Sequence, residues 1–464
     1  MKQARMIRHA GQKGSALVMS LMFVVIFSAL AAAVAGMSGA NVQIAENQQK
    51  ADNARACAES GLEVLRYWIN KVEISGLIAN DQRFGELATA FQSELSDAGI
   101  TNIAPTYDGS STITIPNVPL ESSLGGSFSA VLTKIDNDTV RLDVTGHCRS
   151  FSRTIRSNYC FETRANTVFD FGVASKGPIS LSGNVELEGV NIEVESNAYI
   201  ESENAMLALS IIGNSHIAGE VKIVNPDAYV YLQGGKAGIG GETGEDAMNH
   251  VTIGVGSCAF PEMNPDLFTG YATRELTPED NTSADATYTN LKIPAGMNPS
   301  FSGQVTLKGV VYIQAPNVVT FSGGVDVTAI IVTDGEDTDN SATNRLIFIG
   351  NVTGHPITEL PDTTEFAGVR DQIGTFIIAP GFHVGFGGSF STLSGAIAAN
   401  GIQMWGNAGG TINGSIINYS DAQMGLQGNT DLYFNRSGLV EPPAGFVPQL
   451  ILNYDNSSYS EVTL

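Results

Sequence analysis

The side chains that most often carry catalysis or metal binding are scattered along this 464-residue sequence. Zinc binding and nucleophilic catalysis require histidine, cysteine and carboxylate groups at short, regular spacings. The spacings G-x-S-x-G, H-E-x-x-H, C-x-x-C and the phosphate-binding loop are all absent. The six histidines are His9, His147, His216, His250, His355 and His383. We therefore predict that the protein is not an enzyme and that it has no zinc site.

The four cysteines leave the redox state open. They are Cys57, Cys148, Cys160 and Cys258. If the body of the protein is exported, one or two disulfides are allowed, and four cysteines permit three full pairings. The alternative is that each cysteine is an unpaired small apolar residue.

Five arginines lie within 24 residues and form a basic cluster in an otherwise acidic chain. They are Arg141, Arg149, Arg153, Arg156 and Arg164. One interpretation is a contact patch, centred on the first four, for DNA, a polyanionic glycan or an acidic neighbouring subunit. The other interpretation is the solvated face of a hairpin.

An acidic stretch, DGEDTDNSATN, occupies residues 334–344 and offers several carboxylate oxygens. These oxygens suit calcium, but Asp334, Glu336, Asp337 and Asp339 lack the glycine and terminal glutamate spacing of an EF-hand. We interpret the stretch as a solvated acidic loop and keep calcium as the alternative. No other cofactor or metal is expected.

The charge of the chain is divided unevenly. The formal net charge is −23, yet the first fourteen residues hold four of the 24 basic residues and no acid, which leaves −27 for the rest. A body this acidic repels polyanions at long range, so general nucleic-acid binding is not expected.

A long apolar segment follows the basic N-terminus, from Ala16 to Met37, and no charge occurs between Lys13 and Glu46. About 20 apolar residues suffice for a helix to cross a bilayer, and the preceding positive charges favour a cytoplasmic N-terminus. A secretory signal peptide would have a shorter apolar core and a clear A-x-A exit. A plain membrane anchor fits the hydropathy equally well.

The residues around Gly14 distinguish these alternatives. The run Lys13–Val18 (KGSALV) resembles a prepilin processing signal, and Glu46-Asn47 with Ala54–Leu62 (ARACAESGL) extends the resemblance over residues 10–70. The segment is similar to the PilX-type minor pilin N-terminal family. That resemblance implies cleavage between Gly14 and Ser15 by a prepilin peptidase, followed by methylation of the new N-terminus. It also implies a single-pass inner-membrane state before assembly, and then a periplasmic or extracellular filament built with other pilin subunits by an inner-membrane machine.

The sequence departs from the major pilins at one position. Major pilins carry glutamate at the fifth mature residue, where it pairs with a neighbouring N-terminus. Counted from Ser15, that position is Met19. An uncharged side chain removes the buried ion-pair partner, which predicts a tip or rare-subunit role.

We expect an α+β protein in which the helix continues beyond the membrane. Ala54, Ala58, Leu62, Leu65, Ile69 and Val72 recur every three or four residues, which predicts one packed face. Residues 81–98 predict a second helix, and alternating runs between 111 and 161 predict a small antiparallel sheet with a hairpin turn at residues 136–138. The expected segments are a leader (1–14), a transmembrane and filament-core helix (15–40) and a pilin-like unit (41–166).

The remainder repeats a short pattern of apolar residue, any residue, glycine and a small or polar residue. The glycines of its copies are Gly183, Gly213, Gly303, Gly323, Gly350, Gly406 and Gly428, with a looser copy at residues 384–387. Short alternating runs between turn glycines predict a right-handed parallel β-helix over 167–435 and a C-terminal tail over 436–464. A β-sandwich is the structural alternative.

Together these features predict a minor type IV pilin or pseudopilin that displays a β-rich domain for adhesion or assembly, with a surface or glycan as the ligand. Two alternatives remain. One is a single-pass anchored periplasmic β-helix protein, and the other is a tethered polysaccharide-degrading enzyme.

Overall fold

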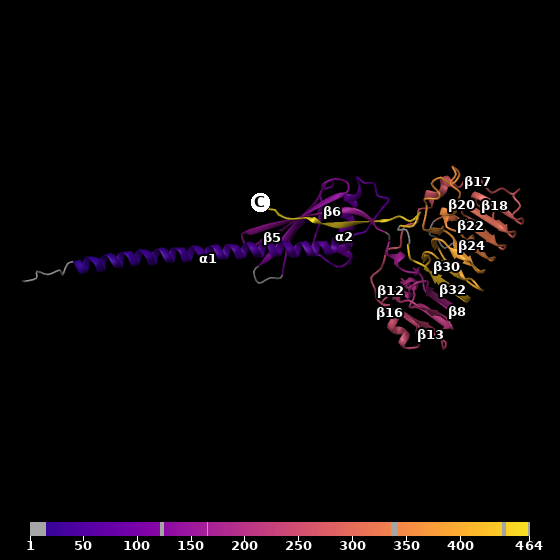
Figure 1. Ribbon diagram of the computed structural model, residues 1–464, viewed down its shortest axis with the longest axis horizontal. Helices are drawn as coiled ribbons and strands as arrows, with labels where there is room; N and C mark the ends of the chain where they lie inside the picture. The colour runs from indigo at the N-terminus through magenta and orange to yellow at the C-terminus, as the bar shows by residue number, and fades with distance from the viewer. Residues whose placement is uncertain (1–14, 121–124, 165, 336–341, 439–441, 463–464) are drawn as a thin grey trace, which may run out of the picture. The chain divides into compact units, whose positions relative to one another are not determined.

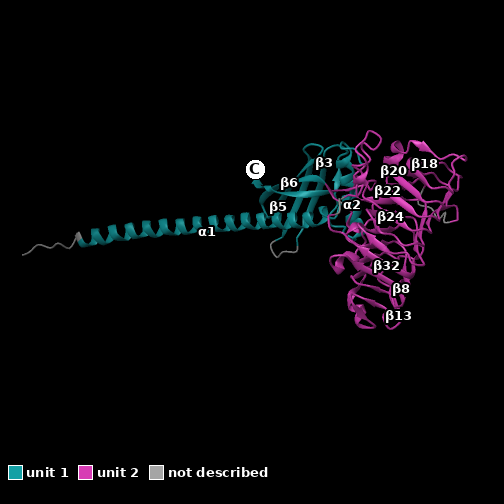
Figure 2. Cartoon of the chain, turned by 45° about the vertical axis from the view of Figure 1, so that its right-hand side comes forward, with its two compact units in different colours: residues 1–74, 78–162, 451–464 teal, residues 75–77, 163–450 magenta. Residues whose placement is uncertain are grey.

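The computed structural model describes residues 15–120, 125–164, 166–335, 342–438 and 442–462. The chain divides into two compact units, coloured separately in Figure 2. Unit 1 comprises residues 1–74, 78–162 and 451–464, and unit 2 comprises residues 75–77 and 163–450. Each unit is described by itself.

Helix α1, Ser15–Ile69, has 55 residues and is the long N-terminal helix of unit 1 (Figure 1). At a rise of 1.5 Å per residue it is about 83 Å long. Its first part is exposed, whereas one face of its second part is buried. The predicted face is confirmed from Ala54 to Ile69, where each of its five residues is at most 5% exposed, and Val72 is buried just beyond the end of the helix.

The rest of unit 1 is a second helix and a seven-stranded sheet in the described residues. Helix α2, Arg83–Asp97, buries Phe84, Leu87, Ala88, Phe91 and Leu95. The sheet has the order β1-β33-β6-β5-β4-β3-β2. Its strands are β1 Ile74–Ser75, β2 Thr106–Tyr107, β3 Thr112–Pro119, β4 Gly126–Lys134, β5 Thr139–Cys148, β6 Phe151–Arg164 and β33 Gln449–Val462.

Strands β2 to β6 pair in sequence as an antiparallel meander. The turn between β4 and β5 forms at the predicted position. There the Asp136 carboxylate accepts hydrogen bonds from the backbone N–H groups of Asp138 (2.9 Å) and Thr139 (2.7 Å). The turn is therefore stabilised by one of its own residues, so its position can be predicted from the local sequence.

The predicted C-terminal tail, residues 436–464, needs correction, because it contains the 14-residue strand β33 of the sheet of unit 1. Strand β33 lies between β1 and β6. The Ser458 hydroxyl accepts a hydrogen bond from the Asn158 N–H (2.7 Å), and the Asn453 amide donates one to Glu162 (3.0 Å). Residue numbers therefore rise along β6 as they fall along β33, so the two strands run antiparallel. Unit 2 is inserted between two neighbouring strands of unit 1.

Unit 2 is a mostly-β domain with two large sheets, of 14 and 12 strands in the described residues, and its pairing is parallel except at β14–β15. In the 14-stranded sheet are β8 Ile179–Gly189, β10 Leu207–Gly213, β11 His216–Ile217, β13 Tyr229–Gln233, β14 Gly238–Ile239, β15 Glu242–Thr243, β19 Ser300–Phe301, β21 Asn317–Phe321, β23 Asn344–Phe348, β26 His383–Phe386, β27 Thr392–Leu393, β29 Ile402–Met404, β30 Gly410–Ile412 and β32 Met424–Phe434. In the 12-stranded sheet are β7 Val173–Ser175, β9 Ala198–Ile200, β12 Val221–Ile223, β16 Val251–Ile253, β17 Arg274–Glu275, β18 Ala286–Ile293, β20 Val305–Ile313, β22 Val325–Thr333, β24 Val352–Gly354, β25 Thr375–Ala379, β28 Ala396–Ala399 and β31 Ile416–Asn418.

The repeated glycines stack along one corner of unit 2. A Cβ atom added to Gly183 would lie 2.6 Å from the carbonyl oxygen of Gly428, and one added to Gly213 would lie 2.6 Å from that of Gly183. Gly428 meets Gly406 at 2.4 Å in the same way, and Gly350 meets Gly323. Backbones this close exclude any side chain, which is why the pattern requires glycine.

The apolar residue that opens each repeat points into a shared core. Phe301, Phe321, Phe348 and Phe386 form a column, with ring centroids 4.8, 5.2 and 5.0 Å apart and ring planes within 13° of parallel. The spacing matches the distance between neighbouring strands. The column shows that equivalent positions of successive repeats lie one above the other.

The order of strands in space differs from their order in sequence. From β7 and β8 the chain proceeds to one edge of the sheets, and it then crosses to the opposite edge through residues 254–285. It returns until β31 pairs with β7 and β32 pairs with β8. The crossing segment holds the 3-10 helix η4, Pro265–Tyr271, whose Phe268 is buried against the outer side of the 12-stranded sheet.

Candidate functional site

The candidate site of unit 1 is the first part of α1, whose apolar side chains have no protein cover. More than half of each large apolar side chain there is exposed to solvent. These residues are Leu17, Val18, Met19, Leu21, Met22, Phe23, Val24, Val25, Ile26, Phe27, Leu30, Val34, Met37, Val42 and Ile44. In the described part of the chain, α1 is the one helix long and apolar enough to cross a membrane.

The physical consequence is that this segment needs a partner. Burying a large apolar side chain is worth about 1.5–3 kcal/mol relative to leaving it in water. An unbroken row of such side chains therefore favours a lipid bilayer or a bundle of similar helices over water.

The predicted processing site lies at the start of this segment. Helix α1 begins at Ser15, and Gly14 lies outside the described residues. Met19 lies in the second turn and is 66% exposed. The first turn of α1 contains no acidic residue. The exposed surface at the predicted fifth mature position is therefore apolar, and it offers no carboxylate to a neighbouring chain.

The predicted basic patch is largely neutralised within unit 1. The Asp143 carboxylate accepts two hydrogen bonds from Arg156, at 2.6 and 3.1 Å, and it lies 3.3 Å from Nε of Arg141. The bond to Asp143 raises the pKa of Arg156. Nε of Arg153 lies 3.5 Å from a carboxylate oxygen of Glu461. Three arginines of the patch therefore share two carboxylates within unit 1, those of Asp143 and Glu461.

Arg149 is separate from these pairs, since it occupies the β5–β6 turn with a φ of 55°. Arg164 ends β6. Sequence reasoning missed the acidic partners because Asp143 faces Arg156 only once β5 and β6 pair. Glu461 belongs to β33, a strand that the sequence did not predict.

The acidic stretch that suggested calcium is described only in part. The Asp334 carboxylate accepts a hydrogen bond from the backbone N–H of Ala315, and burial raises its pKa. Glu336, Asp337 and Asp339 lie outside the described residues. The one described carboxylate of the proposed set is therefore engaged with the backbone.

The structure brings together another group of side chains of the types that bind metals, which the sequence analysis did not identify. Single ligand atoms of Glu186, Glu188 and His216 lie within 4.8 Å of one another, and Nε2 of His216 lies 3.4 Å from the Glu188 carboxylate. The side chains come from β8 and β11, neighbours in the 14-stranded sheet. Carboxylate and imidazole groups in this arrangement could hold a divalent cation. Their separation in sequence left no motif to detect.

All four cysteines are free thiols. Cys57 and Cys148 are buried in unit 1, and burial raises the pKa of the Cys57 thiol. A raised pKa keeps the thiol protonated and unreactive. Cys57 and Cys148 therefore pack in unit 1 as small apolar residues.

Comparison with known proteins supports the assignment of the N-terminal segment. Residues 13–63 match the family model described as PilX N-terminal. No functionally curated protein matches the chain. Among solved structures, the chain is similar to the competence-associated pilin ComZ from Thermus thermophilus, with 12% identity, coverage of 89% of this chain and 98% of ComZ, and a TM-score of 0.24.

A second similar structure is an ice-binding protein (LeIBP) from Arctic yeast. It has 9% identity and a TM-score of 0.21, and the match covers 61% of this chain and 96% of the ice-binding protein. TM-scores of 0.24 and 0.21 are too low to support an argument, so the assignment of the N-terminal segment rests on the family match. Together with the exposed apolar helix that starts at Ser15, it shows that residues 13–63 are a PilX-type pilin N-terminal region.

Proposed function

We propose that this protein is a minor type IV pilin or pseudopilin that displays unit 2 on a filament. The observation that carries the proposal is the apolar first part of α1, exposed over residues that match the PilX N-terminal model. Before assembly this segment spans the inner membrane as a single helix. After assembly it packs among the helices of other pilin subunits, in a periplasmic or extracellular filament.

Unit 2 is the displayed domain, and its proposed fold is a right-handed parallel β-helix. The alternation of the chain between two parallel sheets, the stacked corner glycines and the phenylalanine column support this fold. Both ends of unit 2 connect to neighbouring strands of unit 1. Pulling on a bound surface would load two covalent connections, which suits a role in adhesion.

The decisive experiment is to determine the N-terminus of the mature native protein by sequencing and intact mass. The proposal expects a start at Ser15 with an N-methyl group, after cleavage by the prepilin peptidase. A Gly14→Leu variant should keep the leader and fail to enter filaments. A mature protein that begins at Met1 would show a plain membrane anchor, and loss of the apolar segment would show a secretory signal.

The proposed rare-subunit or tip role rests on Met19. A Met19→Glu variant restores an ion-pair partner at the fifth mature position and should become more abundant along the filament. The matched Met19→Gln variant is polar but uncharged, and it should leave abundance unchanged. Immunogold counts along purified filaments measure the effect. Equal counts for both variants and the natural chain would contradict the role assigned to Met19.

A further inference from the structure

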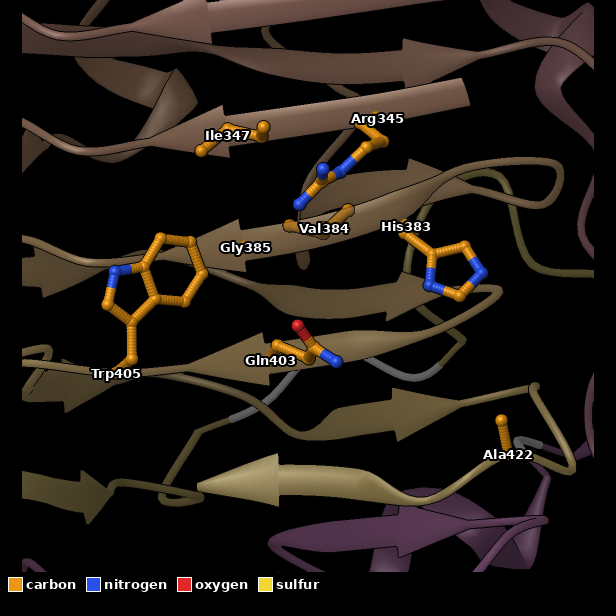
Figure 3. A pocket seen from close by; sticks show the side chains of 8 residues that line it. All are labelled: Arg345, Ile347, His383, Val384, Gly385, Gln403, Trp405 and Ala422. Carbon is orange, nitrogen blue, oxygen red and sulfur yellow. The ribbon is translucent and has the colours of Figure 1, made fainter. Parts of the chain in front are cut away.

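The outward face of the 14-stranded sheet carries a groove with a volume of about 360 Å³ (Figure 3). It lies over strands β23, β26 and β29, and the side chains of Arg345, Ile347, His383, Gln403 and Trp405 surround it. Its floor is the backbone of β26 at Gly385. A hollow of this size is at the lower end of the range seen for small-molecule sites.

Trp405 lies across two glycines. A Cβ atom on Gly385 would lie 2.7 Å from Cζ3 of Trp405, and one on Gly387 would lie 2.7 Å from its Nε1. The indole therefore rests on β26 only because both positions lack side chains. Figure 3 looks onto the sheet and shows the indole ring broadside at one end of the groove. Its half-buried state leaves part of the ring accessible.

Polar groups with planar hydrogen-bonding ends surround the rest of the groove. Arg345 pairs in register with His383, and Gln403 pairs with Gly385, so these residues stand on neighbouring strands whose backbones are about 4.8 Å apart. In Figure 3 the Arg345 side chain extends toward β26, and the Gln403 amide lies over β29 on the other side of β26. No carboxylate lines the groove among the described residues, although the protein as a whole is strongly acidic.

We propose that this groove binds a short saccharide that carries a carboxylate, with a pyranose ring on Trp405 and the carboxylate on Arg345. The negative face of an indole attracts the polarised C–H groups on one side of a sugar ring. Guanidinium, amide and imidazole groups match the hydroxyls at the ring edge, and guanidinium binds carboxylate in a bidentate manner. The −27 charge of the body disfavours long polyanions, so nucleic acid is the less suitable ligand.

This inference rests on the proposed function, because a domain displayed outside the cell is the one that would meet such a saccharide. The test exploits the tryptophan count, since the chain has two, Trp68 and Trp405. In the full chain in detergent, a Trp68→Phe variant leaves Trp405 as the single emitter. Titration with digalacturonate should change its emission in a saturable manner, with a weaker response to lactose and none to an eight-residue thymidine oligonucleotide.

Variants separate the two contacts. Arg345→Gln should weaken digalacturonate binding about tenfold or more and leave lactose binding nearly unchanged, because charge-assisted hydrogen bonds are the stronger ones. In calorimetry, Trp405→Ala should abolish binding of both sugars, and Gly385→Ser should do so by filling the floor. The controls Lys236→Gln and Tyr231→Ala remove an exposed charge and an exposed aromatic ring elsewhere in unit 2, and they should have no effect.

The proposal is overturned if digalacturonate leaves the emission of Trp405 unchanged, if Arg345→Gln binds as the natural chain does, or if the oligonucleotide binds more tightly than the sugar. These readouts are independent of processing at Gly14. A chain that binds digalacturonate but starts at Met1 would overturn the filament role alone. A chain that starts at Ser15 and does not bind digalacturonate would overturn the saccharide-binding proposal alone.

Discussion

Gly146 marks the closest approach of sheet and helix in unit 1. A Cβ atom at this position of β5 would lie 2.0 Å from the carbonyl oxygen of Ala54 and 2.3 Å from the backbone nitrogen of Ala58. Both atoms belong to the backbone of α1 and cannot rotate away as a side chain could. Glycine at this one residue therefore sets the distance between α1 and the sheet.

We predict that Gly146→Ala destabilises unit 1 by at least about 2 kcal/mol, within the cost of overpacking a core. The matched control is Gly85→Ala in α2, where an added Cβ is 3.7 Å from Tyr107 and should stabilise by up to about 1 kcal/mol. Urea unfolding of the full chain in a Trp405→Phe background, followed by Trp68 emission, reports on unit 1. Equal midpoints for the two variants would refute the packing argument.

Asp108 stabilises a turn before β3 through its ionised form. Its carboxylate accepts hydrogen bonds from the backbone N–H groups of Ser110 (2.8 Å), Ser111 (2.9 Å) and Thr112 (3.0 Å). These bonds lower the pKa of Asp108 to about 2. Because the folded-state pKa is depressed, the contribution to stability is complete above the unfolded value near 4 and is lost as the pH falls toward 2.

We therefore predict that Asp108→Ala lowers the urea midpoint of unit 1 at pH 7 and that this difference shrinks between pH 4 and pH 2. The site is exposed, so the effect will be small and salt will not remove it, since hydrogen bonds rather than distant charges produce it. Asp81→Ala, which removes another exposed carboxylate of unit 1, is the control. A midpoint difference independent of pH would contradict the assignment.

At the scale of elements, the column of stacked phenylalanines holds the strands of unit 2 in register. Phe321 lies between Phe301 and Phe348 and is 1% exposed. Removing its ring leaves a cavity with two unsupported neighbours, so we predict that Phe321→Ala destabilises unit 2 by about 3–5 kcal/mol. Urea unfolding in a Trp68→Phe background, followed by Trp405 emission, measures this cost.

Ile349→Ala is the matched control for that prediction. Ile349 directly follows β23 in the same sheet, but its side chain is 52% exposed, so its truncation should change stability by less than about 0.5 kcal/mol. If Phe321→Ala proves as mild as this control, the column contributes little, and the register must come from the glycine corner.

The two parts of helix α1 have different environments. Its second part places alanine and cysteine against the sheet, where small side chains allow the close approach seen at Gly146. Its first part shows large apolar side chains on every side, with no polar face. A helix that is apolar on all sides is stable only when it is surrounded by apolar material, and the burial of α1 within unit 1 begins near residues 50–51.

At the scale of the whole molecule, unit 2 occupies the place of a hairpin turn. Strands β6 and β33 are antiparallel neighbours, yet the chain between them is all of unit 2 apart from residues 75–77. Insertions at a turn are tolerated because the flanking strands still close the same hydrogen bonds. In this arrangement the apolar helix belongs to unit 1, and the insertion leaves the strands of unit 1 paired.

We predict that replacing residues 165–447 by a four-residue turn containing Asn-Gly leaves unit 1 folded. The two strands would then close as an ordinary hairpin, and Trp68 emission and the unfolding midpoint of unit 1 should match those of the full chain carrying Trp405→Phe. Retaining Pro448 preserves the carbonyl that accepts a hydrogen bond from the N–H of Gly76 (2.8 Å). An aggregated product would show that unit 1 requires unit 2 to fold.

The sequence by itself determined the local elements of this protein. The apolar run after Gly14, the helical spacing of Ala54 to Ile69, the turn at Asp136 and the glycine corners were all readable. The reason is that each follows from the fixed direction of side chains along one helix or strand, or from a turn that its own residues satisfy. The PilX-type N-terminal region belongs to this readable part.

Only the tertiary structure decided which distant segments meet. The return of β33 to unit 1, the closure of β32 on β8, the pairing of Arg156 with Asp143 and the meeting of Arg345 with Trp405 all depend on strand order in space. Strand pairing is a choice among many alternatives of similar local quality, and the whole set of buried contacts selects one of them. A groove built from three neighbouring strands therefore leaves no motif in the chain.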